Sequence, residues 1–269
     1  MTTNHPLRVA IMGASGRMGR MLIQAVANNP NAVLVGAFVR DNSSLMATDA
    51  GEMAGIGQLG VQTSVLDLAT HQADVLIDFS LPSALPAVIS ECQKTNTSLV
   101  LGITGLSHND EHMLKKASDT LPIVYAGNYS VGVNLSLNLI AITAKTLPNA
   151  DVEIIECHHK HKQDAPSGTA LMLAKTIASA RDQSLDDVLT TGRNGTAKRQ
   201  QGEIGIHAVR GGEVIGEHTV RFFADGEIIE LTHKADHRQI FANGAVQAGF
   251  WLQTKVRGLY DMQDVLGLK

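Results

Sequence analysis

The stretch LRVAIMGASGRMG, residues 7–19, decides the fold. A short apolar run, Leu7–Met12, leads into a turn with glycines at 13, 16 and 19, and an amphipathic helical pattern follows. This spacing is a variant of the dinucleotide fingerprint, in which the backbone approaches a pyrophosphate at a helix N-terminus. A tight connection without a ligand is the alternative, but the next predicted strand, Val33–Val39, favours a cofactor site. The expected cofactor contacts are Gly13, Ala14, Ser15, Gly16, Arg17 and Met18.

The rest of the first half alternates between apolar strands and helical segments, as a doubly wound parallel sheet requires. The predicted strands are Val75–Phe79, Ser98–Ile103 and Pro122–Tyr125, and the predicted helices between them are Pro82–Lys94 and Ser107–Lys116. The segment 42–60 is rich in Gly and small polar residues and is predicted to be a mobile loop.

The second half predicts a smaller mixed domain. A helix at 131–145, with Leu135, Leu139 and Ile142 expected in the core, leads into it. The further predictions are a strand from Glu153, a helix over Gly168–Ala180, strands at Glu203–Val209, Val214–Phe223 and Glu227–His233, a flexible excursion at 182–201, and a helix at 237–256. The fold class is therefore α/β: a Rossmann-type dinucleotide-binding domain, residues 1–129 with 239–269 returning, plus an α+β substrate and oligomerisation domain, residues 130–238, with an open mixed sheet.

Composition excludes several classes of protein. A net charge of -4 and a pI near 6.2 argue against a nucleic-acid or anionic-membrane surface, so positive charge must act locally. No apolar run has the length of a membrane span, and residues 1–6 lack the features of a signal peptide, so we expect a cytoplasmic protein. Cys92 and Cys157 are isolated, which indicates neither a disulfide framework nor a thiolate metal site.

Positive charge does gather in the stretch EIIECHHKHKQDAPSGTA, residues 153–170. Its imidazoles exchange protons near neutral pH, its lysines carry fixed charge, and the backbone N–H groups after Ser167 add the positive end of a helix dipole. These properties suggest a proton-donating site for a carboxylate substrate. A metal held by His158, His159 and His161 is disfavoured, because no carboxylate or His at a second, helical ligand spacing accompanies them.

The run Glu-x-x-Glu-x-His-His-x-x-Lys-x-Asp-x-Pro-Ser-Gly-Thr-Ala resembles the signature of the dihydrodipicolinate (4-hydroxy-tetrahydrodipicolinate) reductase family of lysine and diaminopimelate synthesis. The resemblance implies hydride transfer from NAD(P)H to a dicarboxylate, with His158 as general acid and Lys162 as charge stabiliser or second proton donor. It also implies substrate contacts from His159, Gly168 and Thr169. A homotetramer, built through the exposed sheet of the second domain, follows from the resemblance alone.

The same resemblance implies that the turns after the middle strands line the nicotinamide and ribose. The residues concerned are Gly102, Ile103, Thr104, Ala126, Gly127, Asn128 and Tyr129. Arg40 ends the second strand, where an acid would accept from a ribose 2′-OH and Arg would pair with a 2′-phosphate. Because Val39 stands where the family often has an acid, we expect NADPH to be preferred over NADH, with Arg40 and Arg17 near the phosphate. Asp41 could still contact the ribose, and a solvated surface charge is the other interpretation of Arg40.

Two other functions remain open. A different nicotinamide dehydrogenase would keep the first half and lack the run at 153–170, and a regulatory NADPH sensor would not need a proton donor beside an anion pocket. The run argues against both. His207, His218, His233 and His237 are predicted to be structural, and Asp164 and Ser167 to be caps and loop braces rather than nucleophiles.

Overall fold

The computed structural model describes residues 5–269, so the predicted lack of a signal peptide at residues 1–6 lies mostly outside the described part. Internal contacts divide the chain into two compact units. Unit 1 runs to Ser130 and resumes over Gln239–Lys269, and unit 2 is Val131–Arg238. Within residues 5–269, no helix combines the length and apolar character needed to cross a membrane.

Unit 1 is built on a parallel sheet of seven strands within the described residues, in the order β12-β6-β5-β4-β1-β2-β3. The strands are β1 Leu7–Met12, β2 Ala32–Phe38, β3 Thr63–Ser64, β4 Val75–Asp78, β5 Ser98–Leu101, β6 Pro122–Tyr125 and β12 Gly258–Tyr260. Chain order reverses between β1 and β4, which is the switch point of a doubly wound sheet. The predicted α/β class is confirmed.

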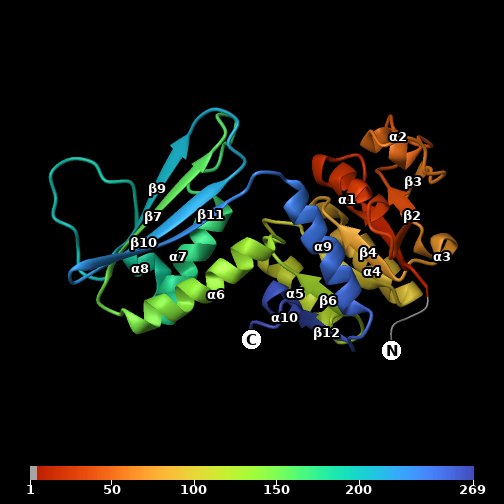
Figure 1. Ribbon diagram of the computed structural model, residues 1–269. Coiled ribbons are helices and arrows are strands. Elements are labelled where there is room, and N and C mark those ends of the chain that lie inside the picture. Colours follow the sequence, from red (N-terminus) through yellow and green to blue (C-terminus); the bar gives the residue numbers. More distant parts are fainter. Residues whose placement is uncertain (1–4) are drawn as a thin grey trace. The chain divides into compact units, whose positions relative to one another are not determined.

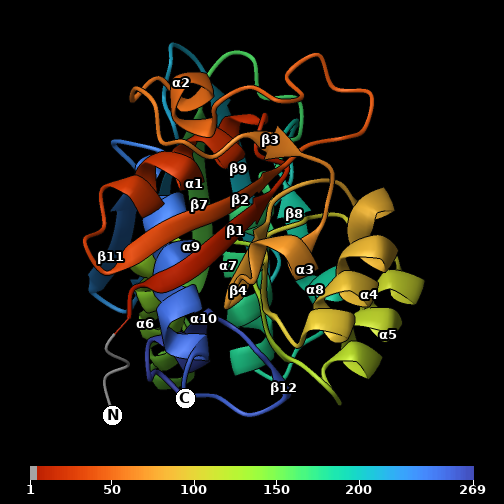
Figure 2. The same cartoon turned by 90° about the vertical axis from the view of Figure 1, so that its right-hand side faces the viewer.

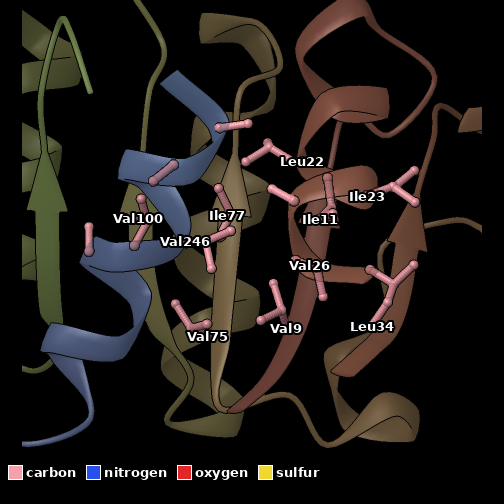
Figure 3. Close-up of a cluster of buried hydrophobic side chains, with 14 of the residues drawn as sticks. Val9, Ile11, Leu22, Ile23, Val26, Leu34, Val75, Ile77, Val100 and Val246 are labelled. Carbon is pink, nitrogen blue, oxygen red and sulfur yellow. The ribbon is translucent and has the colours of Figure 1, made fainter. Parts of the chain in front are cut away.

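Helices cover both faces of this sheet because its central strands, β1, β2, β4 and β5, are mostly apolar and buried. They are α1 Arg17–Ala27, α2 Ala50–Ala54, α3 Leu68–His71, η1 Pro82–Ala84, α4 Leu85–Thr95, α5 His108–Ala117, α9 Gln239–Leu252 and α10 Met262–Val265. Figure 2 shows α1 and α9 on one side of the strands and α4 and α5 on the other. In Figure 3, Val246 of α9 and Leu22 of α1 point at Ile77 and its neighbours on the central strands.

Unit 2 is a mixed sheet in the order β11-β10-β7-β9-β8. Its elements are α6 Val131–Thr146, β7 Asp151–His158, α7 Gly168–Ala180, α8 Leu185–Val188, β8 Leu189–Thr191, β9 Ile204–Arg210, β10 Glu217–Ala224 and β11 Glu227–Lys234. Helices α6 and α7 lie side by side against one face, around Ile154, Ile177 and Phe222 (Figure 1). The opposite face exposes Val209 and Ile228, so the predicted open mixed sheet is confirmed.

One local prediction is wrong, and two others are incomplete. Leu135, Leu139 and Ile142 are exposed, and α6 instead buries Val133 and Ile140. This helix is apolar on several faces, so its period alone could not select the buried one. The excursion at 182–201 contains α8 and β8, and the segment 42–60 contains α2, whose N-cap Asp49 accepts from the N–H groups of residues 51 and 52.

Candidate active site

In unit 1, the glycine turn has the geometry that a dinucleotide pyrophosphate requires. Gly13 has φ +76° and sits against Ser80, and a Cβ on Gly19 would lie 2.2 Å from the carbonyl oxygen of Gly13. Gly16 is the N-cap of α1 and brings no side chain to its first N–H groups, and the first turn, residues 17–20, contains no Asp or Glu. The turn therefore fits an anionic ligand at the start of α1.

The predicted cofactor turns at 102–104 and 126–129 follow β5 and β6, which are neighbours in the parallel sheet, so these turns share the carboxyl edge of the sheet. The N–H of Gly102 donates to the backbone carbonyl oxygen of Asp78 at 2.8 Å. Because Gly102 has no Cβ, the ring of Phe79 can pack against it. Thr104 and Gly127 are exposed on this edge. The structure thus brings the turns together in unit 1.

Three of the predicted cofactor residues have buried side chains. Ala14, Ile103 and Tyr129 lie in the core, and the Tyr129 hydroxyl donates to the carbonyl oxygens of Leu101 at 2.8 Å and Val124 at 3.1 Å. Burial raises the pKa of Tyr129 well above its ordinary value, so the phenol stays neutral. Only the backbone of these three residues is available to a cofactor.

Arg40 is exposed just beyond the end of β2. The last carbonyl of that strand, on Phe38, accepts from the N–H groups of Gly13 and Ala14, both at 3.0 Å. These bonds fasten the end of β2 to the glycine turn. Arg40 and the exposed Arg17 therefore extend from two segments that meet at this turn.

In unit 2, residues 159–167 form the loop between β7 and α7, which we call the basic loop. Strand β7 ends at His158, and α7 begins at Gly168 with Ser167 as its N-cap, whose hydroxyl accepts from the N–H of Ala170 at 3.2 Å. The predicted capping role of Ser167 is confirmed. Lys162 donates to both carboxylate oxygens of Asp164, at 2.8 and 2.9 Å, so Asp164 braces the loop as predicted.

His158 is held by a buried carboxylate. Its Nδ1 lies 2.5 Å from Oε2 of Glu156, which is fully buried, and its Nε2 faces Gly216, where a Cβ would lie 3.0 Å away. The ring of His218 packs edge-on against it at 5.1 Å between centroids. His158 is only 8% exposed, so few solvent contacts compete with these interactions.

The charges around His158 act in opposite directions. Burial lowers the pKa of His158, and Lys162 and Arg210 lower it further, whereas Glu156 works to raise it. The balance leaves the pKa of His158 below its ordinary value. Burial works to raise the pKa of Glu156, but hydrogen bonds from Arg210, His158 and Ser167 hold it below its ordinary value.

The remaining predicted substrate residues lie along the same loop. Gly168 is exposed at the first position of α7, with Thr169 half-buried beside it. His159 is half-buried, with its Nδ1 unpartnered among the described residues, and its ring lies 6.2 Å from that of His161. The loop thus joins a strand-end histidine, a lysine and a helix start.

Two residues that the sequence did not suggest as metal ligands, Glu156 and His218, lie close to His158. Glu156, His158 and His218 bring one potential ligand atom each within 4.8 Å of one another. However, the carboxylate of Glu156 already accepts from Arg210 and from the backbone N–H of Ser167 as well as facing His158. Both oxygens of the Glu156 carboxylate are therefore already occupied by donors, and no metal is assigned to the cluster.

Arg210 and His218 were the residues that sequence reasoning missed at this site. They come from β9 and β10, the two neighbours of β7, and β9 places Arg210 directly opposite His158. His218 contacts the site through its Nε2, 3.1 Å from the Ser167 hydroxyl. Strand register decides both contacts, and a single sequence does not give register between distant strands.

Comparison with known proteins gives one consistent family. Residues 7–129 match the family model described as dihydrodipicolinate reductase, N-terminus, and residues 132–266 match the one described as dihydrodipicolinate reductase, C-terminus. The 4-hydroxy-tetrahydrodipicolinate reductase of Psychrobacter arcticus is 54% identical over 97% of this chain and 95% of its own. That of Hahella chejuensis is 50% identical over 97% and 99%.

A solved structure agrees with these relatives. The dipicolinate-bound dihydrodipicolinate reductase of Paenisporosarcina sp. TG-14 superposes with a TM-score of 0.76 at 25% identity, covering 96% of this chain and 98% of that one.

Proposed function

Because this chain belongs to the dihydrodipicolinate reductase family, we propose that it reduces 4-hydroxy-tetrahydrodipicolinate to tetrahydrodipicolinate in lysine and diaminopimelate synthesis. The observation that supports this best is His158 at the end of β7, within one loop of both Lys162 and the start of α7. A nicotinamide cofactor would supply the hydride when bound. The protein then has to supply a proton and positive charge for two carboxylates.

In this proposal His158 is the proton donor, through Nε2, and Lys162 stabilises charge or acts as a second donor. The lowered pKa of His158 favours its neutral form in the free protein. A bound dianion would favour the imidazolium, because an opposite charge nearby stabilises the charged form. Substrate binding would therefore charge the proton donor at the moment that it is needed.

Recognition of the dicarboxylate is proposed for His159, Gly168 and Thr169. The backbone N–H groups in the first turn of α7 lie at the positive end of the dipole of this 13-residue helix. The dipicolinate bound to the Paenisporosarcina relative supports a dicarboxylate as ligand. We assign substrate binding to unit 2 on these grounds, whereas tetramer formation through unit 2 rests on the family resemblance alone.

Cofactor binding is proposed for unit 1, with NADPH preferred over NADH. Arg40 and Arg17 would contact the 2′-phosphate, and the turns at 102–104 and 126–129 would line the nicotinamide and ribose. A homotetramer and a cytoplasmic location stay predictions, and light scattering of the purified protein tests the first.

The test of function is the loss of reduced-nicotinamide absorbance by purified protein. The substrate is generated in place from pyruvate and aspartate semialdehyde by the preceding synthase. Oxidation that depends on the synthase is the expected result, with a higher kcat/KM for NADPH than for NADH. A folded protein that binds NADPH without oxidising it would contradict the proposal and favour a sensor.

A further inference from the structure

We propose that Glu156 is a positioning residue for this reaction: it fixes the tautomer of His158 and ties that histidine to the start of α7, while Arg210 offsets its charge. The inference rests on the proposed function, because it assumes that His158 is the proton donor. It concerns residues of unit 2 alone.

The carboxylate of Glu156 is fully buried and has four donors. Oε2 faces Nδ1 of His158 at 2.5 Å and accepts from Arg210 at 2.9 Å, while Oε1 accepts from Arg210 at 2.8 Å and from the Ser167 N–H at 3.0 Å. A buried carboxylate is stable only when its charge and lone pairs are satisfied in this way. Each of the four groups is consequently held in place by the same side chain.

The contact with Nδ1 decides which nitrogen of His158 reacts. An ionised carboxylate accepts and cannot donate, so Nδ1 must carry a proton, and Nε2 becomes the position that gains and loses one. Nε2 faces Gly216, where even a methyl group would lie 3.0 Å from it. The absence of a side chain at 216 therefore keeps this nitrogen clear of a tight contact.

The contact with Ser167 sets the distance between two functions. Ser167 is the N-cap of α7, so its backbone is fixed relative to Gly168 and Thr169, the proposed carboxylate seat. Glu156 contacts this N–H with Oε1 and the imidazole of His158 with Oε2. The proton donor and the proposed carboxylate-binding residues are thereby held at a fixed distance and orientation, which positioning of a reacting group requires.

Arg210 offsets the negative charge of Glu156, which lies close to the proposed binding site of the dicarboxylate substrate. Its guanidinium binds Glu156 in a bidentate manner and also donates to the carbonyl oxygen of Asp164, at 2.8 Å. The pair is close to neutral overall, so the substrate is not repelled. The same pairing limits how far Glu156 can raise the basicity of His158.

The charged and titratable groups that face His158 come from every element around it. Glu156 belongs to β7, Lys162 to the basic loop, Arg210 to β9 and His218 to β10. Two of these can be neutralised separately, with opposite expected effects on the imidazole.

The test compares Glu156→Gln with Arg210→Gln. A general acid must be protonated, so kcat falls as pH rises through the pKa of His158. Loss of the carboxylate should move this fall to lower pH by about one unit, and loss of the guanidinium should move it to higher pH by about one unit. In Glu156→Gln, kcat at neutral pH should also fall by about 10²-fold, since the donor is both misaligned and less charged.

Glu153→Gln is the matched control. Glu153 lies on the same strand, on its other face, and likewise contacts arginine and histidine side chains: Arg193 at 2.7 Å, Arg199 at 3.2 Å and His207 at 2.8 Å. Its substitution removes an equal charge from a similar network and should leave the midpoint of the pH profile in place. Equal midpoint shifts in Glu153→Gln and Glu156→Gln would overturn the inference, and so would shifts of Glu156→Gln and Arg210→Gln in the same direction.

A second readout does not depend on turnover. Nitrogen-15 NMR of the labelled protein should show the neutral His158 protonated on Nδ1, and a mixture of tautomers in Glu156→Gln. If Glu156→Gln does not fold, two measurements still test the inference: the tautomer of His158 in the native protein and the pH profile of kcat in Arg210→Gln. A native His158 that is protonated on Nε2 would overturn the inference. A His158→Gln variant with full turnover would instead refute the proposed donor, whatever the tautomer.

Discussion

Single histidines in this chain differ because their surroundings differ. His218 is 6% exposed, and burial, with the nearby charge of His158, lowers its pKa to about 4. It is therefore neutral at physiological pH and serves as a hydrogen-bond partner for Ser167 rather than as a charge. The same residue type at position 158, beside a carboxylate, is suited to proton transfer.

His218 should make the folded state sensitive to acid. Its pKa in the unfolded chain is near 6.5, so between pH 6.5 and 4 the unfolded state binds more protons and stability falls as pH falls. The full contribution, present above pH 6.5, is up to about 3 kcal/mol. Urea unfolding at pH 7 and pH 5 should show a smaller loss in His218→Gln than in the native protein. An unchanged loss would contradict this assignment, and His112→Gln is a surface control.

His158→Gln should lower kcat by about 10² to 10⁴-fold, the usual contribution of a positioned general acid. The dissociation constant for NADPH should stay within about twofold, because the residues proposed for the cofactor belong to the other unit. Steady-state kinetics and calorimetric titration of NADPH measure the two quantities. A raised KM with native kcat would assign His158 to binding.

Arg40→Ala should narrow the advantage of NADPH over NADH by about tenfold in kcat/KM, through loss of a pairing with the 2′-phosphate. Arg8→Ala, which changes an arginine of β1, is the matched control. Equal effects of Arg40→Ala on the two cofactors would contradict its assigned role.

At the level of helices and strands, sequence pattern succeeded where local chemistry is strong. Helix α7 was predicted with its observed ends, because Ser167 is a good N-cap and the apolar residues that follow keep a helical period. Short elements such as α8, β8 and β12 were not predicted, since three or four residues are too few to show a hydrophobic period. The site was predicted in its contiguous part only; Arg210 and His218 join it through sheet register.

Ser167→Ala should destabilise the protein by about 1 kcal/mol through loss of the cap on Ala170, and the loss of the contact with His218 adds to this. Binding of the proposed dicarboxylate ligand, measured with dipicolinate as the probe, should weaken as well, since the first turn of α7 would be less ordered. Thermal unfolding and calorimetry measure both effects. Ser107→Ala, which removes the N-cap of α5 in unit 1, should cost similar stability without weakening dipicolinate binding.

At the level of the whole molecule, the two proposed ligands are assigned to two different units. Gly13→Val should therefore abolish NADPH binding, because it places a branched side chain at φ +76° against Ser80. Dipicolinate binding measured without cofactor should persist in this variant if it remains folded by circular dichroism. Loss of both ligands from a folded variant would show that the two sites are not independent.

Unit 2 is inserted between two pieces of unit 1, and this has a consequence for synthesis. The ribosome synthesises the whole of unit 2 before it makes α9 and β12, which cover one face and complete one edge of the seven-stranded sheet. Until then the apolar face formed by Val75, Ile77 and Val100 lacks its final cover (Figure 3). The nascent first half is thus the part that most needs protection from aggregation, although it emerges first.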